Sequence, residues 1–122
     1  MKKILLVEDN PDNRDLVCAF LEFDYEITSF PSGHEALEYL GAADVEAPDV
    51  LLLDIALPGI DGVELLRRIR ALTHIQRIPA IALTAHAMKG DEQRFMAAGF
   101  DAYVPKPIVD DQALIEAIEG LD

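Results

Sequence analysis

Short apolar runs alternate with segments of helical periodicity along the whole chain. Two of the runs, ILLV and VLLL, are apolar at every position, which is typical of central strands that helices cover on both faces. The predicted strands are Lys3–Val7, Tyr25–Phe30, Val50–Asp54, Ile78–Thr84 and Ala102–Val104.

Between these strands, apolar residues recur at intervals of three and four, which predicts amphipathic helices. The marker positions are Leu16, Phe20 and Phe23 in the first helix, Ala36, Leu37 and Leu40 in the second, Val63, Leu66, Ile69 and Leu72 in the third, and Leu114, Ile118 and Leu121 in the last. The segment Met88–Ala98 has the weakest pattern, because its centre, KGDEQR, is polar and contains a glycine.

Polar residues mark where these helices begin. The predicted capping residues are Asn10 and Ser32, and the third and last helices are predicted to open near Asp61 and near Asp110. Pro11 follows the first of them, at a helix position where proline is favoured. Glu35 stands three residues after Ser32, which completes a capping box. Strands that alternate with helices predict a doubly wound α/β domain with a parallel sheet. At 122 residues, one such domain accounts for the chain.

Composition narrows the classes of function. Hydrophobic residues make up 51% of the chain, and no run approaches the roughly 20 apolar residues that span a membrane. The N-terminal apolar run is too short for a signal peptide, so a cytoplasmic location is expected. The formal net charge is −13, which argues against direct nucleic-acid binding. The one basic cluster, Arg67, Arg68 and Arg70, is interpreted as the solvated face of a helix.

Chemistry-bearing residues follow the ends of the strands. Ligands of open α/β sheets bind beyond the carboxyl ends of the strands. The residues that the strands deliver to this edge are Glu8, Asp9, Asp54, Thr84 and Lys106. Each has a structural alternative, such as capping a helix or lying in a solvated turn. Asp54 is the hardest to explain in that way, because it ends an apolar run.

This set of side chains suits one reaction class. Three close carboxylates repel one another unless a cation compensates, and Mg²⁺ prefers such oxygen ligands. Lys106 adds a positive charge, and Thr84 adds a hydrogen-bond donor. A carboxylate nucleophile with a metal, a cation and a hydroxyl is what phosphoryl transfer to aspartate requires.

The motifs LLVEDN, LLLDIALPGIDG, ALTAHA and YVPKP occur in an order and spacing that resemble the receiver domain of bacterial two-component response regulators. The resemblance covers residues 1–122 as one domain. It implies a flavodoxin-like sheet in the order 2-1-3-4-5, with five helices on both faces. It also implies a signalling domain rather than an enzyme, one that catalyses only its own phosphorylation and dephosphorylation.

By this resemblance, Asp54 accepts the phosphoryl group from a phosphohistidine of a sensor kinase or of a phosphotransfer protein. Asp9 and Asp54 would bind Mg²⁺ directly, and Glu8 would act through water. The backbone carbonyl of Ala56 would complete the protein ligands. The acidic pair in this chain is Glu-Asp, a family variant that leaves the metal site intact.

The resemblance also assigns the switch. Thr84 and Lys106 would contact the phosphoryl oxygens, and Tyr103 would turn inward as Thr84 moves. That change would reshape the surface of the fourth helix, fifth strand and fifth helix, where a downstream protein would bind. Ala56 and His86 flank the phosphoryl site and would tune the lifetime of the phosphate. The stretch TAHAMKGD favours a stand-alone or hybrid-kinase receiver.

Three alternatives stay open. A phosphatase of the haloacid-dehalogenase type would need a second acid two residues after the nucleophile, where this chain has Ala56. A flavin or nucleotide binder would need a phosphate-cradling loop after the first strand, where this chain has the acidic VEDNPDN. A receiver that binds partners without phosphorylation would not need the five strand-end residues that this chain retains.

Overall fold

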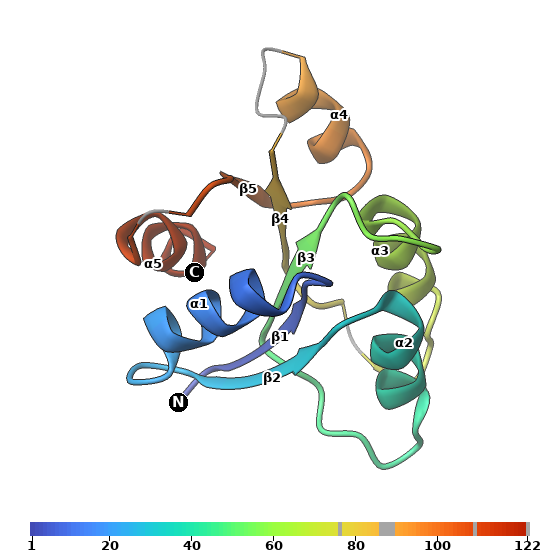
Figure 1. Cartoon of the computed structure of the whole chain (residues 1–122). Coiled ribbons are helices and arrows are strands. Elements are labelled where there is room, and N and C mark those ends of the chain that lie inside the picture. The colour runs from blue at the N-terminus through green and yellow to red at the C-terminus, as the bar shows by residue number, and fades with distance from the viewer. Residues whose placement is uncertain (76, 86–89, 109, 122) are drawn as a thin grey trace.

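The computed structural model describes residues 1–75, 77–85, 90–108 and 110–121. It contains one five-stranded parallel sheet in the order β2-β1-β3-β4-β5 (Figure 1). The strands are β1 (Lys3–Val7), β2 (Glu26–Phe30), β3 (Val50–Asp54), β4 (Ala80–Thr84) and β5 (Ala102–Pro105). The predicted strand order is confirmed, and the predicted bounds of β1 and β3 agree at both ends. The strands β2 and β4 begin one and two residues later than predicted.

Helices cover both faces of the sheet, as predicted. They are α1 (Pro11–Leu21), α2 (Gly33–Gly41), α3 (Gly62–Arg70), α4 (Asp91–Ala97) and α5 (Gln112–Glu119). Figure 1 shows α1 and α5 on one side of the sheet and α2 and α3 on the other. The buried residues agree, since α1 and α5 share one core cluster, whereas α2, α3 and α4 share the second. Within the described ranges, no helix has the length and apolarity needed to cross a bilayer.

The central strand β3 and its neighbour β4 are buried at every residue. Their side chains alternate between the two core clusters, so that Leu51 and Leu53 pack against α2 and α3 while Leu52 packs against α1 and α5. This is the burial expected of a parallel sheet with helices on both faces. The central position of β3 therefore holds its last residue, Asp54, on a rigid strand.

Capping residues place the beginnings of the helices. The side chains of Asn10, Ser32 and Asp61 accept hydrogen bonds from amides three residues later, at 3.0, 3.2 and 2.9 Å. The last helix opens near Asp110, as predicted, and Asp111 is the N-cap residue of α5. Asp110 instead accepts a hydrogen bond from the amide of Gln112 at 3.0 Å.

The predicted apolar face of the first helix is wrong. Val17 and Leu21 are the buried residues of α1, whereas Leu16 is 39% exposed and Phe23 is 84% exposed. Phe20 packs only at the edge of the core. The helix ends at Leu21, so Phe23 lies beyond it. The pair that faces the sheet is Val17 and Leu21, one position after the predicted pair of Leu16 and Phe20.

The weak helical pattern before the fifth strand corresponds to a short helix, α4, whose only buried residue is Phe95. Its N-cap residue, Gly90, has a φ of +107°, in the region that favours glycine, and makes no side-chain capping bond. The first residues of the predicted segment, 88–89, lie outside the described residues. The short length of α4 agrees with the weakness of its sequence pattern.

Candidate functional site

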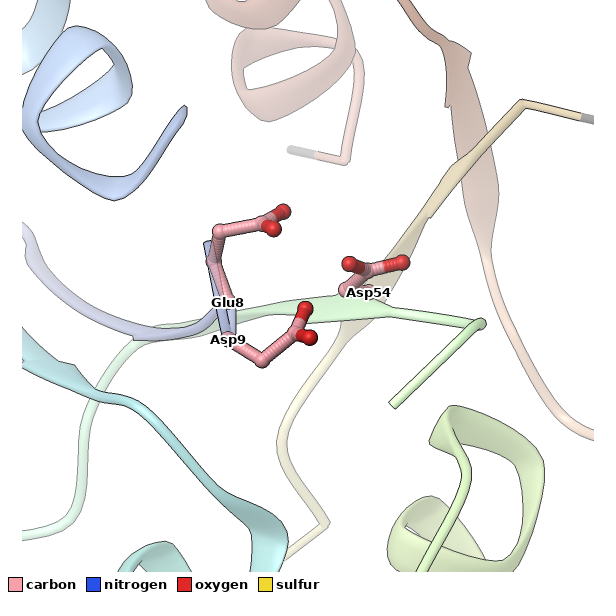
Figure 2. A group of neighbouring side chains, drawn as sticks. All are labelled: Glu8, Asp9 and Asp54. Atoms are coloured by element: carbon pink, nitrogen blue, oxygen red, sulfur yellow. The ribbon is translucent and has the colours of Figure 1, made fainter. Parts of the chain in front are cut away.

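Three carboxylates meet at the carboxyl edge of the sheet (Figure 2). Glu8 and Asp9 follow the end of β1, and Asp54 is the last residue of the neighbouring strand β3. One oxygen from each carboxylate lies within 4.8 Å of the other two. The predicted acidic cluster is therefore present, because parallel strands that pair in register end at the same edge.

Glu8 is held at every polar group. Its side chain is buried, its amide donates to the carbonyl of Phe30 at 3.1 Å, and its own carbonyl accepts from Nη1 of Arg14 at 3.0 Å. Its Oε1 accepts from the amide of Asn10 at 3.2 Å, and its Oε2 lies 2.8 Å from Nζ of Lys106 in an ion pair. These contacts fix the direction of a side chain that would otherwise have several rotamers.

Asp54 is equally constrained and is only 3% exposed. Its Oδ1 accepts a hydrogen bond from the amide of Ala56 at 3.0 Å, and its Oδ2 accepts one from Nζ of Lys106 at 2.9 Å. The amide of Ile55, the next residue, donates to the carbonyl of Leu83 in β4 at 3.0 Å. A buried carboxylate with both oxygens bonded has one well-defined orientation.

Lys106 is the cation of this site. Its Nζ lies between Glu8 and Asp54, and its amide donates to the carbonyl of Thr84 at 2.8 Å. Thr84 ends β4 and is buried, and its neighbour Leu83 pairs in register with Asp54. The structure thus brings together the five predicted strand-end residues, four of them directly linked by hydrogen bonds or ion pairs.

Burial and charge act in opposite directions on the titration of this cluster. Burial raises the pKa of Glu8, and the charge of Asp54 adds to this, while Lys106 opposes it. Burial alone would lower the pKa of Lys106, but its bonds to Glu8 and Asp54 outweigh burial and raise that pKa. Lys106 therefore stays protonated and offsets part of the repulsion between the carboxylates.

Gly62, the first residue of α3, packs closely against the backbone of Asp54 and Ile55. Its amide donates to the carbonyl of Ile55 at 3.1 Å. A methyl group on Gly62 would stand 2.8 Å from Cα of Ile55 and nearer still to the carbonyl oxygen of Asp54. Only glycine allows this approach. The sequence interpretation missed Gly62. The signal that could have found it is a glycine directly after Asp61, at the first position of a helix.

The donor set fits a hard divalent cation. Glu8, Asp9 and Asp54 offer only oxygen atoms, and Asp9 is exposed at the open side of the cluster. Mg²⁺ prefers carboxylate and carbonyl oxygens and keeps several waters. Ala56 reaches the site through its amide. The predicted role of its carbonyl as a metal ligand stays a prediction.

Two predicted site residues remain, Tyr103 and His86. Tyr103, in β5, is half-buried and packs at the edge of the core cluster beneath α2, α3 and α4. His86 lies outside the described residues, so its predicted influence on the phosphate lifetime stays a prediction.

A hollow of about 350 Å³ borders the site. Glu8 and Lys106 line one side of it, while Leu16 and Val17 of α1 and Ile108 after β5 line the rest. A partly apolar recess between α1 and the segment that precedes α5 therefore lies beside Glu8 and Lys106.

Comparison with known proteins agrees with the resemblance carried by the sequence motifs. The family model described as the response regulator receiver domain matches residues 4–119. The chain is 41% identical over 108 residues to the polar-differentiation response regulator DivK of Brucella abortus, which covers 88% of this chain and 85% of DivK.

Solved structures agree with the fold. The chemotaxis response regulator CheY4 of Vibrio cholerae superimposes with a TM-score of 0.87 at 25% identity, covering 100% of this chain and 99% of that one. The receiver domain of a sensor histidine kinase of Pseudomonas aeruginosa has a TM-score of 0.81 at 34% identity, covering 97% of this chain and 95% of that one. That structure holds a magnesium ion in its active site cleft.

Proposed function

Because the chain belongs to the family of response regulator receiver domains of two-component systems, we propose that its switch is the transfer of a phosphoryl group to Asp54. The observation that carries the proposal is the position of this buried carboxylate. Asp54 ends a central strand, is bonded to Lys106 at 2.9 Å, and lies beside Glu8 and Asp9. No other aspartate of the cluster combines burial with a direct bond to the lysine, since Asp9 is exposed.

The proposed phosphodonor is a phosphohistidine of a sensor kinase or of a phosphotransfer protein. A carboxylate oxygen of Asp54 attacks phosphorus, a new P–O bond forms, and the P–N bond breaks with its electron pair leaving on the imidazole. Lys106 offsets negative charge on the transferred group, because its ammonium already lies against Asp54. The chain itself thus supplies the nucleophile and the cation.

Glu8, Asp9 and Asp54 are the residues that would hold Mg²⁺, which would neutralise charge on the transferring phosphoryl oxygens. Glu8 is already engaged by the Asn10 amide and by Lys106, and this supports its proposed role through water. Asp9 is free of that constraint on the exposed side. We therefore assign direct ligation to Asp9, and we assign it to Asp54 because the receiver family implies it.

The proposed output is a change in the surface of α4, β5 and α5. Thr84 and Tyr103 lie on adjacent strands at the edge of the sheet nearest α4. A new contact between Thr84 and the phosphoryl group would favour one of two close arrangements of this surface. A downstream protein would bind there. The phosphodonor is made inside the cell, so the proposal implies a cytoplasmic location.

The proposal is tested by incubating the full chain with Mg²⁺ and a small-molecule phosphodonor. We expect one phosphoryl group per chain, stable in acid and labile in base, as an acyl phosphate is. A panel of purified histidine kinases with their phosphohistidines would then identify the donor. A chain that takes up no phosphate from any of these donors would contradict the proposal.

Asp9→Asn is expected to weaken Mg²⁺ binding by about tenfold or more, because one carboxylate ligand becomes a neutral amide. The measurement is calorimetric titration with MgCl₂ without any phosphodonor. Asp12→Asn is the matched control, because Asp12 is an exposed acid of the first turn of α1 outside the cluster. Equal affinities in the two variants would remove Asp9 from the metal site.

Thr84→Ala is expected to accept the phosphoryl group while losing most of the conformational response. A hydrogen bond to a charged group contributes about 1.5–3 kcal/mol, so its loss shifts the two-state equilibrium by about tenfold or more. The measurement is the change in amide NMR shifts of α4 and β5 on phosphorylation. Thr73→Ala, at an exposed loop position, is the control. An undiminished response in Thr84→Ala would contradict the proposed switch.

A further inference from the structure

Arg70 does not lie on the solvated face that the sequence suggested for the basic cluster of α3. Arg67 and Arg68 are exposed and pair with Glu64, as that interpretation requires. The side chain of Arg70 is only 21% exposed and turns away from this face. The prediction is therefore wrong for this one arginine, and its burial calls for a different role.

The guanidinium of Arg70 joins three separate segments. Its Nη1 donates to the carbonyl of Gly99, after α4. Its Nη2 donates to the carbonyl of Ile78, before β4, at 3.2 Å, and lies 3.4 Å from Oδ2 of Asp101, before β5. The planar guanidinium thus links the end of α3 to the segment before β4 and to the segment after α4.

Asp101 extends these contacts. Its Oδ2 accepts from the amide of Ala80 at 2.9 Å, its Oδ1 pairs with Nη2 of Arg77 at 2.9 Å, and its own amide donates to the carbonyl of Ala80 at 2.8 Å. Burial pushes the pKa of Asp101 up, but the Ala80 amide and the two arginines outweigh it and lower that pKa. The carboxylate therefore stays charged. We call Arg70, Arg77 and Asp101 the α4–β5 anchor.

The anchor holds the C-terminal end of α4. The amides of Gly99 and Phe100 donate to the carbonyls of Met96 and Phe95, each at 3.1 Å. The rings of Phe95 and Phe100 are buried and meet edge to face at 6.4 Å. The other end of α4 begins at Gly90 without a side-chain capping bond. The contacts of Arg70 and the two rings therefore fix the C-terminal end of this seven-residue helix.

We propose that Arg70 and Asp101 are positioning residues of the switch, which fix the chain from Gly99 to Ala102 so that phosphorylation moves the beginning of α4 but not its end. The inference rests on the proposed phosphorylation of Asp54. Asp101 is two residues before Tyr103, so the backbone of β5 stays in register with β4. Only the side chain of Tyr103 and the start of α4 then respond. The anchor lies at the end of the sheet opposite to Asp54, so it contributes nothing to phosphoryl transfer itself.

Amide hydrogen exchange, read residue by residue with NMR before and after phosphorylation, tests this inference on the full chain. The amides of Phe100 and Asp101 report the anchored end, and the amide of Arg94, which donates to the carbonyl of Gly90, reports the beginning of α4. The variants are Arg70→Gln, and Asp101→Asn, which keeps the shape of the side chain. Arg67→Gln is the control, because it removes an exposed arginine from the same helix.

In the parent and in Arg67→Gln, we expect phosphorylation to change exchange at Arg94 and to leave Phe100 and Asp101 within about twofold. In Arg70→Gln and Asp101→Asn, exchange at Phe100 and Asp101 should be about tenfold faster or more before phosphorylation. In these two variants, exchange at Phe100 and Asp101 should also change on phosphorylation. A merely structural role would speed exchange equally in both states and would not make it depend on the phosphate.

Two outcomes would overturn the inference. One is exchange at Phe100 and Asp101 in Arg70→Gln that matches Arg67→Gln. The other is a phosphorylation response at Phe100 in the parent as large as that at Arg94. Mass spectrometry of the same samples reports phosphate uptake. A parent chain without phosphate would contradict the proposed function, while the unphosphorylated variants would still decide whether the anchor fixes this segment.

Discussion

Replacing Asp54 with asparagine is expected to abolish formation of the acyl phosphate. The amide is nearly the same size as the carboxylate and can still accept the hydrogen bond from Ala56, so the turn after β3 should keep its shape. It is not a nucleophile toward phosphorus at neutral pH. Lys106 keeps its ion pair with Glu8. The variant should therefore fold and lose the reaction.

The measurement is the acid-stable, base-labile phosphate taken up in the presence of Mg²⁺ and a small-molecule phosphodonor, which should fall to background. Asp44→Asn, at an exposed position outside the cluster, should be phosphorylated like the parent. Labelling of Asp54→Asn at the parental rate would move the acceptor to another residue, with Asp9 the next candidate by position.

Gly62→Ala is expected to impair both stability and phosphorylation. The added methyl group would overlap the backbone of Asp54 and Ile55, and backbone atoms of a central strand have little room to shift. Overpacking of this kind costs about 1–3 kcal/mol. Urea unfolding should show a lower midpoint at an unchanged slope, and phosphate uptake should slow because Asp54 is displaced from Lys106.

Gly41→Ala provides the matched control. Gly41 ends α2, and a methyl group there would meet no atom of the described residues within 4 Å. Such a change is expected to be neutral or to stabilise the fold by about 0.4–1 kcal/mol, because it restricts the unfolded chain. If both glycine variants had the same midpoint and the same phosphate uptake, close approach at Gly62 would have no role in positioning the acceptor.

The fold could be predicted from sequence because its signals are local. Apolar runs of four residues and capping residues such as Asn10 and Ser32 specify where strands and helices begin. The local sequence does not determine which face of a helix is buried. Leu16 and Val17 differ by one position on α1, and only packing against the sheet selects Val17.

Much of the site could also be predicted, because parallel strands deliver their last residues to one edge. Pairing of Lys106 with Asp54 could be expected too, but the contact of Lys106 with Glu8 could not, since it depends on side-chain reach. The ion pair between Glu8 and Lys106 joins residues that are far apart in the chain. The burial of Arg70 has the same origin, because its partners Gly99 and Asp101 are brought to α3 only when the sheet is complete.

The strand order has a consequence for the charge balance of the acceptor. Glu8 and Asp9 follow β1, and Asp54 ends β3, the strand that pairs with β1 in the first half of the chain. Lys106 follows β5, the last strand, at the edge of the sheet. Pairing of β1 with β3 alone would place Glu8 beside Asp54 with no ammonium between them. In the folded protein, the charge balance of the acceptor therefore depends on the docking of β5, the last strand of the chain.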